Sequence, residues 1–184
     1  MDELIASFKL ERVGKSGSKF DADKTRWYNQ TYLRTKSNQE LAELLKPTLV
    51  KESIPFEEEK LPGYVDLMKD RAFFVADMIE GAYLFIRPTE YDEKLLGKKW
   101  KEGSADLVLG LVEAFSKTDY SAETLHATFS KYLEENGIGM GAAMPLLRVF
   151  ITGRGVGPGM FETMEFLGRD ESESRLKLGL ESRT

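Results

Sequence analysis

Residues 141–168 read GAAMPLLRVFITGRGVGPGMFETMEFLG. This stretch predicts a helix, a tight corner of glycine and proline, and a second helix. Pro145 is expected near the start of the first helix, where a missing N–H costs little. Pro158 is expected to open the second helix, and Gly168 to end it. The glycines of the corner, residues 153–159, let the backbone approach a large or flat partner closely.

Two arginines accompany this corner, Arg148 in the first predicted helix and Arg154 in the corner itself. Their guanidinium groups place positive charge beside bare backbone. Two interpretations follow. The corner is a plain turn, which is the commoner role of glycine-rich loops, or it is part of a binding surface. The hairpin taken alone favours the plain turn.

The composition is that of a globular protein with a real core, since 41% of the 184 residues are hydrophobic. The formal net charge of −5 argues against nucleic-acid binding by bulk charge alone, and leaves room for a local basic face. The chain has no cysteine and the single histidine His126, so disulfides, thiolate metal sites and histidine clusters are excluded. No apolar run approaches a membrane span and no signal peptide opens the chain, so we expect a cytoplasmic setting without membrane contact.

Helical periodicity dominates the chain, and it predicts an all-α fold with about nine to eleven helices. Asp21 is a plausible N-cap for a helix that runs to Arg34. The sequence Ser-Asn-Gln-Glu at 37–40 is a capping box, and the helix that it starts is expected to stop at Pro47. A long amphipathic helix is predicted over 64–79.

Three further segments are interpreted from their residue pattern. Trp27, Tyr28 and Tyr32 put much aromatic surface on one predicted helix, which is most simply core. The apolar residues 81–88 (GAYLFIRP) are interpreted as a buried connection rather than a strand. A basic cluster surrounds Trp100, and it either contacts phosphate or forms a solvated turn. Its members are Lys98, Lys99 and Lys101.

Two stretches resemble bacterial glutamyl-tRNA synthetases, which are class I aminoacyl-tRNA synthetases. The first is similar to the helix that follows the ATP-binding lysine loop of these enzymes, and it comprises Lys19-Phe20-Asp21, Trp27, Asn29, Tyr32, Leu33 and Arg34. The second is similar to their C-terminal anticodon-binding part, and it comprises Pro145-Leu146-Leu147-Arg148, Thr152-Gly153, Gly157-Pro158, Phe161, Leu167-Gly168 and Arg175-Leu176. Order and spacing fit over essentially the whole chain.

The resemblance implies an all-α, helical anticodon-binding bundle of two packed subdomains. Residues 1–36 would be the tail of the stem-contact region, 37–88 the first anticodon-binding subdomain and 89–184 the second. The parent enzymes attach glutamate to tRNA(Glu) with ATP and magnesium. Their His-x-Gly-His and Lys-Met-Ser-Lys-Ser types of motif are absent from this chain. We therefore expect it to be catalytically inactive alone, with no catalytic residue, metal ligand or cofactor of its own, and to bind tRNA(Glu) as a monomer.

Within the hairpin, the resemblance marks Arg148 and the corner as contacts for unstacked anticodon bases. A guanidinium can fork to a base edge or stack on its face. Gly157 would allow close backbone approach, while Pro158, Met160 and Phe161 would offer apolar surface to a base plane.

The resemblance places Arg71 at the helix position where family members carry an arginine that reads the third anticodon base. Its fixed donor fork suits the acceptor atoms of cytosine at that position. That match favours an enzyme that discriminates tRNA(Glu) from tRNA(Gln). The alternative is a surface arginine paired with Asp70 or Asp77, an exposed pair that stabilises little. Further candidates for contacts to the tRNA backbone are Arg154, Lys98, Lys99 and Lys101.

A second class of function remains open from the sequence. The chain could be a helical protein-interaction module, or a regulatory paralogue without RNA binding. The two hypotheses differ in geometry. The anticodon hypothesis requires Arg71, Arg148 and the glycine corner to converge on one concave face, whereas the interaction-module hypothesis places no such demand.

Overall fold

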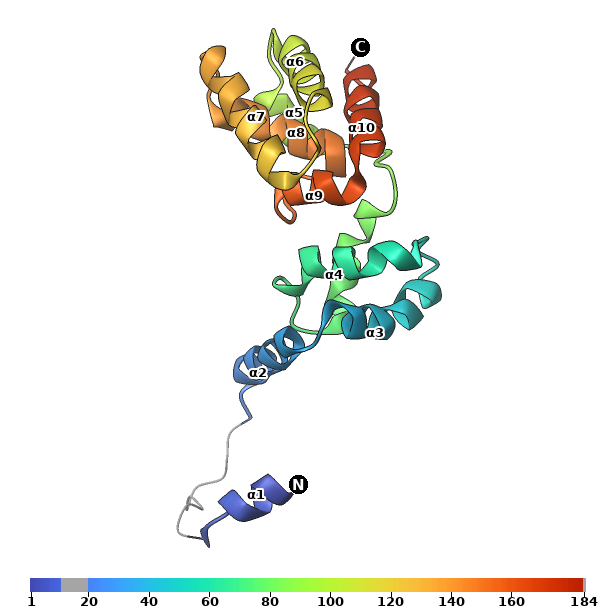
Figure 1. Ribbon diagram of the computed structural model, residues 1–184, viewed down its shortest axis with the longest axis vertical. Coiled ribbons are helices and arrows are strands. Elements are labelled where there is room, and N and C mark those ends of the chain that lie inside the picture. The colour runs from blue at the N-terminus through green and yellow to red at the C-terminus, as the bar shows by residue number, and fades with distance from the viewer. Residues whose placement is uncertain (11–19, 184) are drawn as a thin grey trace.

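The computed structural model describes residues 1–10 and 20–183, and within these ranges the chain is helical and contains no strand (Figure 1). The all-α expectation is confirmed. Lys19, the first residue of one of the two compared stretches, lies outside the described residues.

The first half of the described chain contains four α-helices and two 3-10 helices, and local capping sets several of their ends. The side chain of Asp21 accepts the Lys24 N–H at the start of α2, and the Ser37–Glu40 capping box opens α3, both as predicted. The elements are α1 (Asp2–Ser7), α2 (Ala22–Thr35), α3 (Asn38–Lys51), η2 (Glu58–Lys60), α4 (Leu61–Lys69) and η3 (Val75–Leu84).

Two of the predicted helix ends are wrong. Pro47 lies inside α3, because Leu45 and Leu49 on either side of it are fully buried and hold the helix across the missing hydrogen bond. The long helix predicted over 64–79 is interrupted, since α4 ends at Lys69. The carboxylate of Asp77 then accepts the N–H groups of residues 73 and 74 and starts η3 as a separate element.

The buried connection expected at residues 81–88 is found in its first part only. Residues 81–84 form the last turn of η3, where Gly81, Ala82 and Leu84 are buried. Ile86 and Arg87, which follow, are exposed.

The second half contains six α-helices in the described residues, and it includes the predicted hairpin as α8 and α9. Gly153 ends α8 and Gly168 ends α9, each with a left-handed φ (75° and 79°) that glycine adopts without strain. The helices are α5 (Glu93–Lys99), α6 (Ser104–Ser116), α7 (Ala122–Glu135), α8 (Met140–Thr152), α9 (Met160–Leu167) and α10 (Arg169–Glu181).

Both prolines of the hairpin differ from expectation. Pro158 does not open α9, which begins two residues later with Gly159 as N-cap. Pro145 lies inside α8 rather than in its first turn. A proline there leaves the carbonyl four residues earlier without its helical donor, and the ammonium of Lys99 donates to that carbonyl of Gly141 at 2.9 Å.

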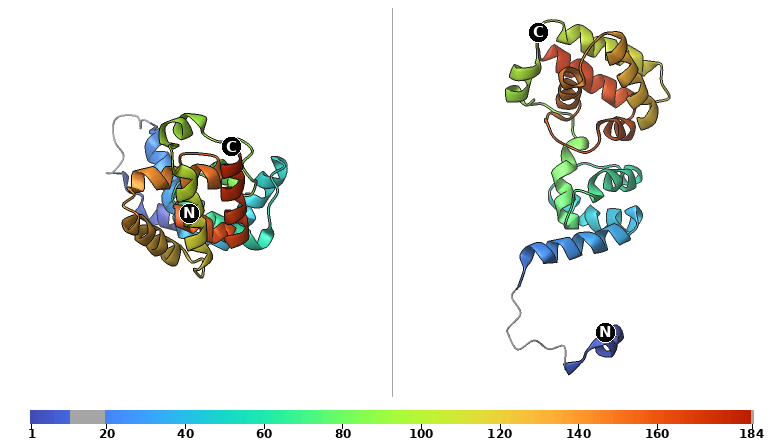
Figure 2. Two further views of the ribbon diagram at one scale, coloured as in Figure 1. Left: turned by 90° about the horizontal axis from the view of Figure 1, so that it is seen from above. Right: turned by 90° about the vertical axis from the view of Figure 1, so that its left-hand side faces the viewer.

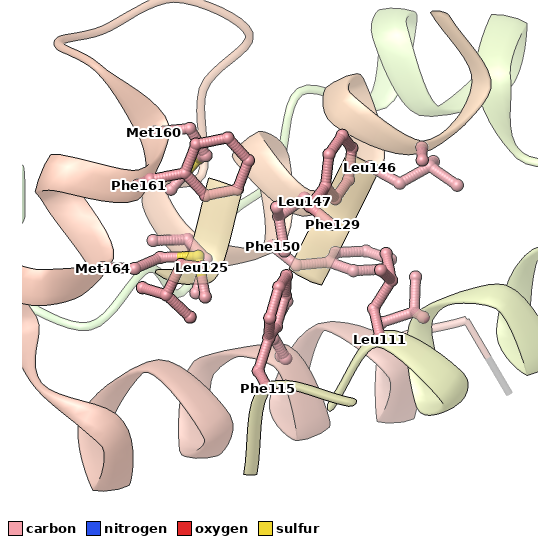
Figure 3. Packing of buried hydrophobic residues seen from close by; sticks show 14 of the residues in the cluster. Leu111, Phe115, Leu125, Phe129, Leu146, Leu147, Phe150, Met160, Phe161 and Met164 are labelled. Atoms are coloured by element: carbon pink, nitrogen blue, oxygen red, sulfur yellow. The ribbon is translucent and has the colours of Figure 1, made fainter. Parts of the chain in front are cut away.

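The buried hydrophobic residues form two clusters, which are stacked along the long axis of the molecule (Figure 2). The first cluster draws on residues 33–84, and the second on residues 96–176. In the second cluster, Phe115, Phe129 and Phe150 interleave with leucines of α6, α7 and α8 (Figure 3). Phe166 of α9 crosses between the halves, because its ring packs on Tyr64 and Phe85 at centroid distances of 6.3 and 6.2 Å.

The aromatic side chains of α2 are not core. Trp27, Tyr28 and Tyr32 are exposed by 58, 47 and 70%, and Leu33 is the buried residue of this helix. The reason lies in how α2 is attached, since Asn29 and Gln30 donate to the backbone carbonyls of Phe73 and Asp70. Polar contacts hold α2 by one side and leave its aromatic rings outside both clusters.

Candidate nucleic-acid interface

Three of the arginines singled out in the sequence meet around the side chain of Tyr83. Arg71 and Arg154 line one pocket together with Tyr83 and Gly157. Arg148 of α8 is not a lining residue of this pocket, but its guanidinium lies next to Gly157, where a Cβ would be 3.2 Å from Nη1, and its charge acts on Tyr83. The structure therefore brings residues that are distant in sequence to one concave face, as the anticodon hypothesis requires.

Three of these groups, Arg71, Tyr83 and Arg154, are positioned by the ends of helices. Arg71 follows α4, where its N–H bonds the Met68 carbonyl at 3.0 Å. Tyr83 lies in the last turn of η3. Arg154 comes just after α8, and its N–H bonds the hydroxyl of Thr152 at 3.2 Å. The pocket thus forms where three helix ends meet, at the junction of the two hydrophobic clusters.

Three arginines place positive charge near Tyr83, and Glu80 is the acidic residue that lines the same pocket. The guanidinium of Arg154 lies 4.9 Å from the centroid of its ring, a cation–π contact. Burial raises the pKa of the Tyr83 hydroxyl, and the charges of Arg154, Arg148 and Arg71 oppose that rise without cancelling it. Tyr83 therefore stays neutral at physiological pH, and its hydroxyl can donate or accept a hydrogen bond.

Arg148 is half-buried and is held by the corner. Its Nη1 donates to the carbonyl of Pro158 at 2.8 Å. Desolvation lowers the pKa of its guanidinium, and the charge of Arg71 acts in the same direction. A guanidinium keeps its charge in a protein despite such a shift, so Arg148 places a positive group beside the pocket.

Arg71 is exposed, and within the described ranges its guanidinium has no hydrogen bond or ion pair. The alternative of pairing with Asp70 or Asp77 is wrong. Asp70 instead pairs with Arg34 at 3.1 Å, and Asp77 accepts two backbone N–H groups at the start of η3. The donor fork of Arg71 is therefore available to a ligand.

Gly157 has a packing reason to be glycine. A Cβ at this position would lie 2.7 Å from the hydroxyl of Tyr83 and 3.2 Å from Nη1 of Arg148. Both distances are shorter than ordinary contacts between such atoms. Because Gly157 has no side chain, the corner can pack closely against Tyr83.

The three apolar residues predicted to face a base plane belong to the core instead. Pro158 is buried, and Met160 and Phe161 are only 3 and 7% exposed. The ring of Phe161 packs on Phe129 at a centroid distance of 5.3 Å (Figure 3). Because α9 turns Met160 and Phe161 into the second cluster and Pro158 is buried just before this helix, none of the three presents a free face. The apolar side chain that the corner does expose is that of Val156, at 73%, which also lines the pocket.

The lysine cluster is not brought to this pocket. Lys98 and Lys99 end α5, Lys101 follows it, and none of the three lines the pocket around Tyr83. Lys99 bonds the carbonyl that Pro145 frees.

Sequence reasoning missed Tyr83 and Val156. The aromatic residue within an apolar segment and the exposed valine within a glycine corner were available signals, but neither indicates a binding pocket without the tertiary contacts. In the residues that the structure describes, no group of histidine, aspartate and glutamate could hold a metal ion. In the same residues, no helix is both long and apolar enough to cross a membrane.

Comparison with known proteins identifies the family of this chain. Residues 40–180 match the family model of the anticodon binding domain, and the chain belongs to this family. It is 38% identical over 183 residues to the glutamate–tRNA ligase of Porphyromonas gingivalis strain W83, a match that covers 98% of this chain and 36% of the relative. The corresponding enzyme of Bacteroides fragilis is 40% identical, with the same coverage.

Solved structures show the same likeness. A crystal structure of a glutamate tRNA ligase from Elizabethkingia meningosepticum, in complex with its amino acid, superposes on this chain with a TM-score of 0.90 at 35% identity. The match covers all of this chain and 37% of that one. The chain is thus homologous to the anticodon-binding part of glutamate–tRNA ligases and spans little more than a third of their length.

Proposed function

We propose that this chain is the anticodon-arm binding part of a glutamate–tRNA ligase and that it binds tRNA(Glu) at the pocket around Tyr83. One observation carries the proposal. Arg71 and Arg154 line one pocket with Tyr83, and the charge of Arg148 also acts on the Tyr83 hydroxyl, in a chain whose net charge is −5. Like charges are gathered in this way where an anionic ligand is to be bound.

The chemistry of the pocket suits a splayed base better than a duplex. Single-stranded bases are bound by stacking on aromatic rings or guanidinium planes and by hydrogen bonds to their edges. The stacked pair of Arg154 and Tyr83 offers such a plane. The free fork of Arg71 can donate to the acceptor atoms of cytosine as the third anticodon base, and on this basis we expect discrimination of tRNA(Glu) from tRNA(Gln).

The activity of such a ligase is shared between this chain and parts that lie outside these 184 residues. ATP, magnesium and the attachment of glutamate belong to those parts, and we propose that this chain supplies no catalytic group and no cofactor site. We expect it to act as a monomer. Its isolated affinity should be low and sensitive to salt, because phosphate contacts dominate such binding.

The test is binding of the chain to a labelled anticodon stem-loop of tRNA(Glu), and to a copy with the third anticodon base changed, by fluorescence anisotropy at low salt. Wild-type protein should prefer the first RNA, and Arg71→Gln should remove the preference. Lys51→Gln is the matched control, since it removes the same charge from an exposed site at the end of α3, and it should keep the preference.

Two results would contradict the proposal in different ways. If wild-type and variant protein bind both RNAs equally, the contact is only electrostatic and Arg71 does not read the third anticodon base. No binding of either RNA at low salt would leave the chain as a helical interaction module.

A further inference from the structure

Arg175 of α10 is a buried guanidinium with partners in both halves of the molecule. It is 1% exposed. Its Nη2 donates to the carbonyl of Leu84 at 2.9 Å, its Nη1 to the carbonyl of Ile151 at 3.0 Å, and its Nε to the carboxylate of Glu171 at 2.8 Å. Leu84 belongs to the first hydrophobic cluster and Ile151 to the second.

The two carbonyls that Arg175 contacts both lie at the C-terminal end of a helix. Leu84 is the last residue of η3, and Ile151 lies in the last turn of α8. Carbonyl groups at the C-terminal end of a helix lack helical donors and carry the negative end of the helix dipole. One guanidinium therefore caps two helices at once, and it fixes the ends of those helices relative to each other.

Both capped ends carry residues of the tRNA pocket. Tyr83 is the neighbour of Leu84 in the chain. Thr152 is the neighbour of Ile151, and its hydroxyl accepts the N–H of Arg154. A shift of either carbonyl would therefore move one wall of the pocket relative to the other.

The guanidinium is itself held in one orientation. Glu171, one turn earlier on α10, accepts from Nε of Arg175, and Arg87 donates to the same carboxylate from Nε at 2.9 Å and from Nη2 at 2.6 Å. Arg87 follows η3 in the chain and so ties the carboxylate to the first half. This chain of contacts fixes the planar fork of Arg175 toward both carbonyls.

We infer that Arg175 is a positioning residue of the tRNA site: by capping η3 and α8 together, it holds Tyr83 against Arg148 and Arg154. The expected effect of Arg175 on RNA binding rests on the proposed function, whereas its expected effect on the geometry of the chain does not. Lysine cannot replace it, because an ammonium is a point charge without the planar fork that reaches separate acceptors.

The first arm of the test needs no RNA. The chain has no cysteine, so spin labels can be placed at Glu52→Cys in the first half and Glu134→Cys in the second, both exposed positions. Double electron–electron resonance should give one narrow distance distribution for the otherwise wild-type chain and a clearly broader one for Arg175→Lys. Arg183→Lys is the control, since Arg183 pairs with Glu93 within the second half, and its distribution should stay narrow.

The second arm measures binding of the tRNA(Glu) anticodon stem-loop. Arg175→Lys should lower the affinity by about tenfold, and Arg71→Gln should cost less in the Arg175→Lys background than in wild type, since residues of one network couple non-additively. Circular dichroism and thermal unfolding establish that each variant is folded. Arg183→Lys should bind like wild type.

If Arg175→Lys does not fold, Glu171→Gln replaces it, since it keeps both carbonyl bonds and loosens only the orientation of the fork. An unchanged distance distribution together with unchanged affinity, in whichever variant folds, overturns the inference. Absence of RNA binding by wild-type protein overturns the proposed function instead, and the distance measurement still decides whether Arg175 fixes the two halves.

Discussion

Two groups of arginines lie at the junction of the two hydrophobic clusters, and they are used in opposite ways. Arg175 and Arg87 donate to carbonyls and to the carboxylate of Glu171. Arg71 has no such partner in the described parts of the chain, and Arg154 is stacked on a ring that leaves its donors open. The same side chain type is a structural element in one group and a free donor in the other.

For Arg175 and Arg71, burial decides which role the arginine takes, whereas the exposed Arg87 joins the first group through its ion pair with Glu171. A buried guanidinium must have its donors satisfied, because an unpaired buried charge is very costly. An exposed guanidinium meets no such demand, since water solvates it until a ligand arrives. The four predictions below test this contrast between the saturated group and the open one.

The largest effect is expected from the same substitution made in each group. Arg175→Met should lower the free energy of unfolding by about 3–5 kcal/mol, because it leaves two buried carbonyls without donors. Arg71→Met should change it by no more than about 0.5 kcal/mol, as is usual for an exposed site. Urea unfolding followed by circular dichroism measures both, and similar losses for the two variants would break the contrast.

A smaller loss of unfolding free energy, which depends on pH, is expected for Glu171→Gln. Burial by itself raises the pKa of Glu171, but the hydrogen bonds and charges of Arg87 and Arg175 outweigh it and hold that pKa below its ordinary value of 4.5. The carboxylate therefore stabilises the fold fully above about pH 4.5, and this contribution is lost as the pH falls through the lowered pKa.

At pH 7 the variant should lose about 1–3 kcal/mol of unfolding free energy, the typical value of hydrogen bonds to a charged group. The difference in urea midpoint between wild type and Glu171→Gln should shrink steadily when the pH is lowered below 4.5. Arg71 has no carboxylate partner among the described residues, so Arg71→Gln should show a pH-independent difference over the same window. A constant difference for Glu171→Gln would mean that its ion pairs contribute nothing.

Gly157→Ala should separate stability from binding in the open group. The new Cβ would meet the ends of the Tyr83 and Arg148 side chains, which can move aside, so we expect the unfolding free energy to fall by about 1 kcal/mol or less. Binding of the tRNA(Glu) stem-loop should weaken, because both displaced groups face the pocket.

The matched control is Gly97→Ala in α5, where a Cβ meets no atom within 4 Å. This variant should gain about 0.4–1 kcal/mol of stability, as an unstrained replacement of glycine in a helix does. It should also bind RNA like wild type. Wild-type affinity in Gly157→Ala would show that the pocket does not depend on this close approach.

The smallest effect is expected for Lys99, which the sequence grouped with the open cations and the structure places against a backbone carbonyl. Lys99→Met should cost about 0.5–1.5 kcal/mol, the net value of one hydrogen bond. In a Pro145→Ala background the cost should fall, since residue 145 then donates its own N–H to the carbonyl of Gly141. A double-mutant cycle by urea unfolding measures the coupling, and additive costs would contradict the assigned role.

How far the sequence predicts this molecule can be followed residue by residue. The Ser37–Glu40 capping box and the glycines at 153 and 168 define helix ends correctly, because capping is a local matter of side chain and backbone. Pro47 and Pro145 give wrong predictions of helix ends, because tertiary contacts override their local effect. Each proline removes one helical hydrogen bond, which the sequence alone treats as a helix boundary or start. Buried leucines hold α3 together across Pro47, and Lys99 of α5 donates to the carbonyl that Pro145 leaves free in α8.

The candidate site divides in the same way. Arg71, Arg148 and Gly157 are identified from the sequence as members of one surface, and the structure brings Arg71 and Gly157 to one pocket with Arg148 beside Gly157. Met160 and Phe161 have the composition expected of a stacking surface, but α9 turns them into the core. Tyr83 lacks any distinguishing local pattern, so its place between the arginines emerges only from the contacts of three helix ends.

The sequence by itself therefore determined the helical class, the family and the residue types available for binding RNA, since periodicity, caps and motif spacing are properties of neighbouring residues. The tertiary structure decided which cations are free. Whether a guanidinium such as that of Arg175 or Arg71 keeps open donors depends on the carbonyls and carboxylates packed around it, and these come from segments far away in the chain.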